Sequence, residues 1–230
     1  LESFLLIMDW AGAEAGPVSG RMDVVRDVAL VVAPALRSAG LIYEAIKVSG
    51  SGEEAAQRLE DFGARGILLL ETAENYRECR DLAAAAACYE EAAHTLELAK
   101  DYRRVADTLI RLGTMYWEAN DLAAARGPFE RALNWLERLQ DLSGQVSALI
   151  VLGHIARARA EPSATTYYQK ALSLTSGQPE MAQQVGQIHY ALGRSHMEAG
   201  EALAAASEYT KAAESFLAAD DSEGRMQAYL

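Results

Sequence analysis

The sequence has little proline and no run of alternating β-branched residues, and these two shortages narrow the fold classes. Only five prolines occur in 230 residues, while half of the residues are apolar. Proline breaks helices, and alternating β-branched residues favour strands, so the composition leaves helices as the favoured structure. We therefore predict an all-α chain with a substantial core.

The chain is also poor in cysteine. Cys79 and Cys88 are too few to staple a fold, and neither has a His or Cys at metal-ligand spacing. We expect both to be reduced, small, buried apolar residues.

No run of about 20 apolar residues marks a membrane span, and the Phe4 to Met8 stretch lacks the flanks of a secretory signal. A soluble, cytoplasmic protein is the expectation.

A surplus of positive charge is missing as well. The formal net charge is −12, and no Lys and Arg cluster forms a phosphate-binding face. This excludes nucleic acid as the expected partner. The acidity fits either a well-solvated helical surface or a basic partner.

What the sequence does contain is an internal repeat of about forty residues. Residues Leu112, Gly113, Ala125, Phe129 and Ala132 place large and small side chains on one face of two successive segments, which are separated by a turn at 120–121. Residues three or four apart share a helix face, so each pair of helices presents an apolar stripe that only a neighbouring pair can cover. The same pattern returns in the other units at Leu69, Ala73, Ala85, Tyr89 and Ala92, at Leu152, Gly153, Tyr168 and Ala171, and at Leu192, Gly193, Ala205, Tyr209 and Ala212.

These anchors resemble the tetratricopeptide repeat (TPR), in its longer variant of about forty residues, over residues 66 to 219. The resemblance implies a right-handed α-solenoid of antiparallel helical hairpins, a TPR-like superhelix. The repeats with their Asp-rich turns also resemble the C-terminal arrays of STAND-class signal-transduction ATPases and transcription regulators. In that family such arrays bind an inducer or hold the ATPase off.

The ends of the repeat region are less regular. Glycine is unfavourable in helices, so we expect a break where Ser49-Gly50-Ser51-Gly52 falls in the second helix of the first hairpin. In the third unit, with Pro162, we expect an inner turn one residue short and a longer exit. Met226 and Leu230 predict self-association through a truncated half-helix at the end of a fragment. The predicted parts are an N-terminal helix and link (1–22), a degenerate hairpin (23–65), four TPR-like hairpins (66–219) and the truncated first helix of a further repeat (220–230).

No catalytic constellation is apparent. The histidines lack a second ligand at metal-binding spacing, and there is no phosphate-binding glycine loop or nucleophile motif. We predict no enzyme activity, no metal and no cofactor.

The expected binding surface is the inner wall, because in the TPR family the first helix of each hairpin faces the concave side. Trp117 is either an interface residue or packing between repeats, and Arg157 with Arg194 is either a binding pair or ordinary solvated charge. A TPR subset grips C-terminal carboxylates with Asn and Lys at set inner positions, which this sequence lacks. The predicted groove residues are Glu74, Arg77, Glu78, Thr114, Trp117, Glu118, His154, Arg157, Arg194, Met197 and Glu198.

The predicted function is a protein–protein interaction module, the sensor or scaffold portion of a larger regulatory protein in signal transduction. Its partner would be a protein, a peptide or another domain of the same parent, and an acidic segment suits the two arginines. The alternative is a small-molecule (inducer) receptor in which the groove closes on its ligand.

Overall fold

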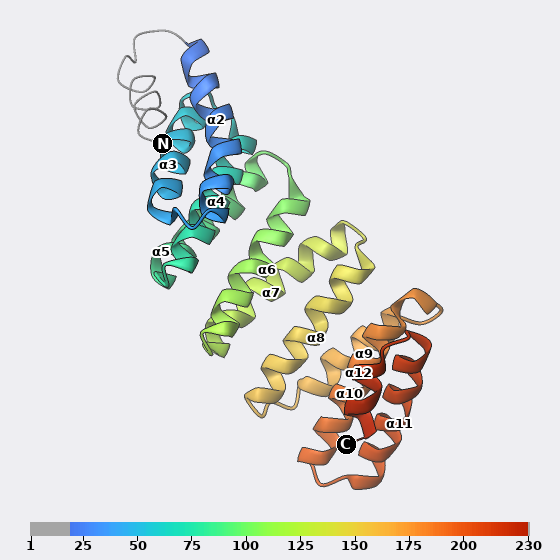
Figure 1. Cartoon of the computed structure of the whole chain (residues 1–230). Coiled ribbons are helices and arrows are strands. Elements are labelled where there is room, and N and C mark those ends of the chain that lie inside the picture. The colour runs from blue at the N-terminus through green and yellow to red at the C-terminus, as the bar shows by residue number, and fades with distance from the viewer. Residues whose placement is uncertain (1–18, 230) are drawn as a thin grey trace. The chain divides into compact units, whose positions relative to one another are not determined.

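The computed structural model describes residues 19–229, and these form eleven α-helices and one 3₁₀ helix, with no β-strand among them (Figure 1). The predicted all-α class is confirmed. The elements are α2 (Ser19–Ser38), α3 (Ile42–Arg58), α4 (Phe62–Glu78), α5 (Leu82–Leu98), α6 (Tyr102–Glu118), α7 (Leu122–Arg138), α8 (Leu142–Ala158), α9 (Ala164–Leu174), η1 (Pro179–Met181), α10 (Ala182–Glu198), α11 (Ala202–Ala218) and α12 (Ser222–Tyr229).

The forty-residue period arises from pairs of equal helices. From α3 to α8 every helix has 17 residues, and three residues separate each helix from the next. An aspartate precedes the helix at most of these starts and accepts a hydrogen bond from the backbone N–H three residues later, as Asp61 does from Ala64 and Asp141 from Gly144. Such N-caps stabilise a helix by about 1 kcal/mol.

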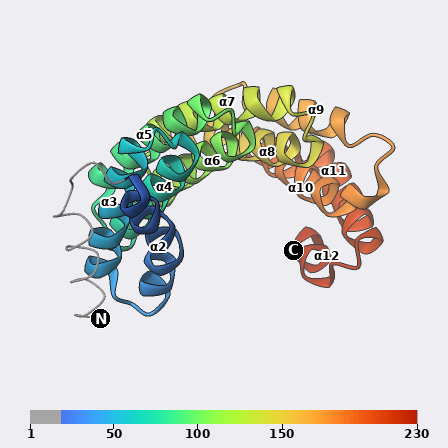
Figure 2. The same cartoon turned by 90° about the horizontal axis from the view of Figure 1, so that it is seen from above.

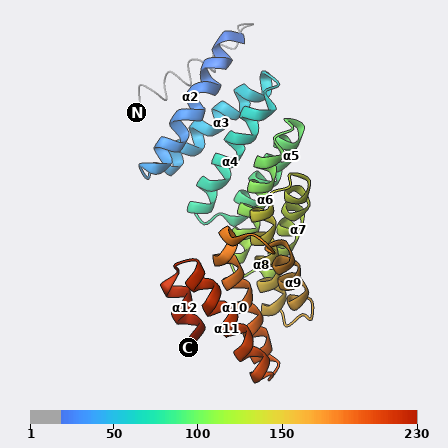
Figure 3. The same ribbon diagram turned by 90° about the vertical axis from the view of Figure 1, so that its right-hand side faces the viewer.

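The chain divides into two compact units, residues 1–119 (unit 1) and 120–230 (unit 2). In unit 1, each of the helices α2 to α6 packs on the next, and α2 also contacts α4. In unit 2, α7 to α12 do the same, and α10 contacts both α8 and α12. Figures 2 and 3 show two layers of helices within each unit. One layer consists of α2, α4 and α6 in unit 1, and of α8, α10 and α12 in unit 2. We call the helices of this layer the A helices.

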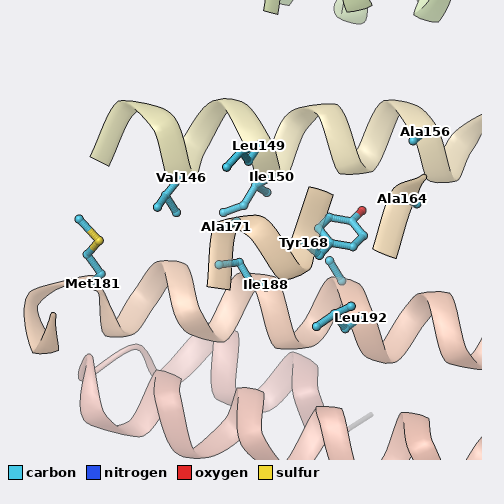
Figure 4. Close-up of a cluster of buried hydrophobic side chains, with 11 residues drawn as sticks. Val146, Leu149, Ile150, Ala156, Ala164, Tyr168, Ala171, Met181, Ile188 and Leu192 are labelled. Carbon is cyan, nitrogen blue, oxygen red and sulfur yellow. The ribbon is translucent and has the colours of Figure 1, made fainter. Parts of the chain in front are cut away.

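Apolar side chains from three successive helices fill the core of unit 2 (Figure 4). Tyr168 of α9 lies fully buried between α8 and α10, near Ile188 and Leu192 of α10. The helix pair α10–α11 continues in the same way, with Phe216 packing against Ala228 of α12. This arrangement covers the apolar stripe of one hairpin with that of the next.

The expected break in the first hairpin is wrong, because α3 runs without interruption from Ile42 to Arg58. Packing explains this. A β-carbon on Gly52 would lie 2.2 Å from Cβ of Ala29, so glycine allows α2 and α3 to approach closely. Ser49 is fully buried, and its hydroxyl hydrogen-bonds that of Thr72 at 2.8 Å. Tertiary contacts therefore outweigh the low helix propensity of this segment.

Two predicted boundaries also move. Helix α4 begins at Phe62 and not at residue 66, because Asp61 caps it, and α2 begins at Ser19, inside the predicted link. The remainder of the predicted N-terminal helix and link lies outside the described residues.

The third unit is irregular in a different way from the prediction. Five residues, Arg159 to Ser163, join α8 to α9, so the expectation of a shorter inner turn is wrong. Pro162 lies in this connection, and α9 is shortened to 11 residues. The exit is longer, as predicted, and contains η1.

The environment of the cysteines differs from the expected burial. Cys79 is exposed, because it follows the last residue of α4 at the helix end, and Cys88 is half-buried. Burial, together with the carboxylates of Glu53, Glu91 and Asp81, raises the pKa of the Cys88 thiol to about 11. That thiol is therefore protonated at neutral pH.

Met226 lies on α12, the last helix of unit 2, and is 61% exposed. Self-association through this end stays a prediction. No helix among residues 19–229 is both long enough and apolar enough to cross a membrane.

Candidate functional site

Each hairpin from α4–α5 to α10–α11 combines a small residue on its A helix with an aromatic residue on its second helix. A β-carbon on Gly153 would lie 2.3 Å from the ring of Tyr168, and one on Gly193 would lie 2.7 Å from the ring of Tyr209. The ring thus occupies the space that a side chain at the glycine would need. The residue after the small one, His154 or Arg194 in unit 2, is thereby placed beside the rim of the aromatic ring.

Glu74 is the corresponding residue of unit 1, and it is buried, not exposed as predicted. Its carboxylate is 5% exposed and accepts contacts from Arg77 at 2.9 Å and Arg111 at 2.8 Å. Burial alone would raise its pKa, but hydrogen bonds from Arg111 and Arg77 outweigh burial and lower it. Glu74 is therefore a charged anchor for two arginines.

His154 is also largely enclosed. Its Nδ1 lies 2.9 Å from the hydroxyl of Tyr168, and the two rings meet edge to face with centroids 5.6 Å apart. Burial, and then the positive charges of Arg157 and Arg194, lower the pKa of His154 to about 4. The imidazole is therefore neutral at physiological pH.

Ion pairs of constant sequence spacing join successive A helices. Arg37 contacts Glu78 at 3.3 Å, and Arg157 contacts Glu198 at 2.5 Å. In the remaining example Arg77 contacts Glu118 at 3.4 Å. In each pair 41 residues separate the two partners.

Trp117 stands at the arginine position of this series and Ala158 at the glutamate position, and these two residues cannot form an ion pair. Arg157 is thus a paired residue with a side chain only 17% exposed, and Glu198 is its partner at 51% exposure. Because it is paired with Glu198, Arg157 is neither an unpaired arginine nor an ordinary solvated charge.

Arg194 differs from Arg157. It is exposed on α10, and within the described part of the chain no carboxylate forms an ion pair with it. Met197, three residues later, is 54% exposed. The A-helix face of α8 and α10 therefore presents one unpaired guanidinium, one paired guanidinium and an apolar side chain, which we call the α8–α10 face (His154, Arg157, Arg194, Met197 and Glu198).

The other six predicted groove residues lie in unit 1. Thr114 and Trp117 are half-buried on α6, whereas the Glu118 side chain is 58% exposed. Arg77, Glu78 and Glu118 line a pocket of about 350 Å³ at the ends of α4 and α6. Its other lining residues, which the sequence argument missed, are Arg80, Leu82, Met115 and Ala119.

A further pocket of about 390 Å³ lies in unit 2, between the irregular α9–α10 connection and the end of α11. Small and apolar residues such as Pro179, Ala182 and Val185 line much of it. Among residues 19–229, no group of three or more His, Cys, Asp and Glu side chains is arranged to hold a metal ion.

No protein-family model matches this sequence, and no curated protein matches it in sequence. Solved structures do match the fold. BtubC (BKLC) from P. vanneervenii is 20% identical with a TM-score of 0.67, and the match covers 95% of this chain and 90% of that one. The STAND protein PH0952 from Pyrococcus horikoshii, described as having a tetratricopeptide repeat sensor, is 17% identical with a TM-score of 0.67.

That second match covers 91% of this chain and only 33% of the STAND protein. A Rap protein complexed with Competence and Sporulation Factor is 14% identical with a TM-score of 0.54, over 92% of this chain and 63% of that one. The chain has a TPR-like repeat fold. In this TPR-like fold the residues of the α8–α10 face lie on A helices, and those of the unit 1 pocket lie on A helices, in the turns that follow them or, for Leu82, at the start of α5.

Proposed function

We propose that this TPR-like chain is a non-enzymatic protein-interaction module that binds an acidic segment, either of a partner protein or of another domain of its parent protein. The likeness to a STAND sensor supports a regulatory role in signal transduction, and the Rap protein complexed with its factor supports a binding role for the fold. The free thiols of Cys79 and Cys88 fit a reducing, cytoplasmic location.

The observation that carries the proposal is the unpaired guanidinium of Arg194 on the α8–α10 face. Arginines in this fold are mostly used in ion pairs, as Arg77 and Arg157 are. An arginine that stays exposed beside the apolar Met197 has five N–H donors available for a carboxylate. Arginine next to apolar surface is also typical of interface hot spots.

The neutral state of His154 leaves the guanidinium groups as the positive charges of the α8–α10 face. Neutral imidazole adds no further positive charge that would need compensation, and its hydrogen bond fixes the Tyr168 ring beneath the face. The positive potential of the α8–α10 face therefore comes from the guanidinium groups, whose geometry allows a planar, bidentate contact with a carboxylate.

The test is a selection of random twelve-residue peptides displayed on phage, with the purified chain as the bait. We expect the bound peptides to be enriched in Asp and Glu. For one selected peptide, Arg194→Ala should weaken binding by about 2 kcal/mol, the size of a hot-spot loss. Lys170→Ala, which removes an exposed cation from α9, is the matched control and should leave the affinity unchanged.

Selected peptides without acidic residues, or an affinity that Arg194→Ala leaves unchanged, would contradict the proposal. Arg157→Ala is a poorer probe, because it also leaves Glu198 without its partner. Trp117→Ala separates the two interpretations of that residue: a binding role predicts lost affinity, and a packing role predicts a lower melting temperature.

The small-molecule receptor is the second candidate function, and one observation favours it. The unit 1 pocket has a volume of about 350 Å³ and lies between A helices of the repeat. This volume falls within the range of about 300 to 1,000 Å³ that is typical of small-ligand sites.

A further inference from the structure

The unit 1 pocket has charges of both signs around an apolar floor. Arg77 and Arg80 supply guanidinium groups, Glu118 supplies a carboxylate, and Leu82 and Met115 supply apolar surface. Glu78 is a further carboxylate of the wall. A ligand with charge of only one sign would pair with either the guanidinium groups or the carboxylates and would leave the other groups without a partner.

One wall of the pocket is fixed from behind. Arg77 contacts the buried Glu74 through two nitrogens, Nε at 3.0 Å and Nη2 at 2.9 Å. Glu74 is itself held by Arg111 at 2.8 Å. The Arg77 guanidinium therefore keeps its position without a ligand, which lowers the entropic cost of binding one.

The rest of the pocket lining has unused capacity for hydrogen bonds. Arg80 is exposed in the turn after α4, and it forms no ion pair with any residue in the described range. The contacts of the two carboxylates are long, at 3.3 Å from Arg37 to Glu78 and 3.4 Å from Arg77 to Glu118. Both carboxylates can therefore accept further hydrogen bonds from an ammonium group.

The repeat itself shows which of these residues the fold does not require. Arg77 and Glu118 recur eighty residues later as Arg157 and Glu198, which form the same ion pair. Arg80, however, corresponds to Ala160 at the end of α8. Both residues have the same left-handed backbone, with φ of 60° and 53°, so the turn forms equally well with alanine. The pocket floor changes too, since Ser195 stands where unit 1 has Met115.

From this arrangement we infer that the unit 1 pocket binds a small zwitterion, a molecule with a carboxylate, an ammonium group and an apolar side chain. The carboxylate pairs with Arg80, next to the fixed Arg77. The ammonium group lies between Glu78 and Glu118, and the apolar part covers Leu82 and Met115. Free aliphatic amino acids are the simplest members of this class.

The experiment is titration calorimetry of the full 230-residue chain with L-leucine, N-acetyl-L-leucine and L-leucinamide. We expect L-leucine to bind, and each analogue, which lacks one of the two charges, to bind about tenfold more weakly or less. Arg80→Ala should weaken L-leucine binding by about the same factor. Its circular dichroism should be unchanged, because Ala160 shows that the turn accepts alanine.

Lys100→Ala is the matched control. Lys100 has the same positive charge and the same backbone conformation, with φ of 60°, in the turn after α5, and it does not line the pocket. Its replacement should leave L-leucine binding unchanged.

Three results would overturn the inference: no binding of L-leucine at about 10 mM, a concentration that detects even weak sites, equal binding of all three compounds, or unchanged binding in Arg80→Ala. The peptide selection on the α8–α10 face uses residues of unit 2, so its outcome and this one are independent. Loss of peptide binding in Arg194→Ala with intact L-leucine binding would show two separate sites.

Discussion

Cε1 of Tyr168 lies 2.3 Å from the position that a β-carbon on Gly153 would occupy. A methyl group there must displace either the fully buried ring or the helix that carries it. We expect Gly153→Ala to lower the free energy of unfolding by about 1 to 3 kcal/mol, the usual cost of overpacking. Urea unfolding followed by circular dichroism measures this change.

Gly127 is the control for that substitution within unit 2. It lies on α7, and a β-carbon there would meet no atom within 4 Å. Gly127→Ala should therefore stabilise the chain by up to about 1 kcal/mol through helix propensity alone. If both variants were equally stable, the close approach of α8 to Tyr168 would not depend on glycine.

Two glycines of α3 should respond to alanine with opposite signs. Gly50 has open space around its Cα, whereas a β-carbon on Gly52 would lie 2.2 Å from Cβ of Ala29. We expect Gly50→Ala to raise the free energy of unfolding by about 1 kcal/mol and Gly52→Ala to lower it by more than that. Thermal unfolding of both variants and the parent chain measures these changes. If both substitutions changed the stability in the same direction, the proposed close packing of α2 on α3 at Gly52 would be contradicted.

Asn75 is a buried residue of unit 1 whose replacement should stabilise the fold. Its side chain is fully buried, and neither atom of its amide has a hydrogen-bond partner. Two of the equivalent repeat positions carry Met115 and Ile155, which are apolar and buried. An unsatisfied buried amide costs about 1 to 3 kcal/mol, so Asn75→Leu, which keeps a similar branched shape, should recover part of that.

The comparison for Asn75 is a buried polar pair whose two hydroxyl groups hydrogen-bond each other. Ser49 and Thr72 share a 2.8 Å hydrogen bond, so Thr72→Ala should cost about 1 kcal/mol or more. Chemical denaturation compares the two variants. A loss of stability in Asn75→Leu would mean that bound water satisfies the amide.

The repeat was predictable because its causes are local. The pattern of Leu112, Gly113 and Ala125 returns about every forty residues, and aspartates such as Asp101 precede the helices that they cap. The exposure of the site residues was not predictable in the same way. Glu74 is buried because Arg111, 37 residues later, and the ring of Tyr89 enclose it, and neither contact follows from spacing within one helix.

One long-range contact did leave a signal in the sequence. Arginine at 37, 77 and 157 and glutamate at 78, 118 and 198 recur at a fixed separation, which identifies the ion pairs between A helices. Arg80 left none, because it lies in a turn where the repeat tolerates many residue types. Its importance appears only when the pocket that surrounds it is seen.

His154 should make the stability of the fold depend on pH. Burial, with Arg157 and Arg194 nearby, lowers its pKa from 6.5 to about 4 in the folded state. Between these two values the unfolded chain binds a proton that the folded chain does not bind. Stability from this group is therefore fully present above pH 6.5 and is lost as the pH falls towards 4.

The groups that face His154 include the Tyr168 hydroxyl and the guanidinium groups of Arg157 and Arg194. His154→Gln removes the titrating group and leaves every carboxylate in place. We expect the parent chain to lose about 3 kcal/mol more than this variant on acidification from pH 7 to pH 4. Urea unfolding of both proteins at several pH values measures the difference. Parallel stability curves would show that the imidazole titrates normally and that Tyr168 and the guanidinium groups do not hold it neutral.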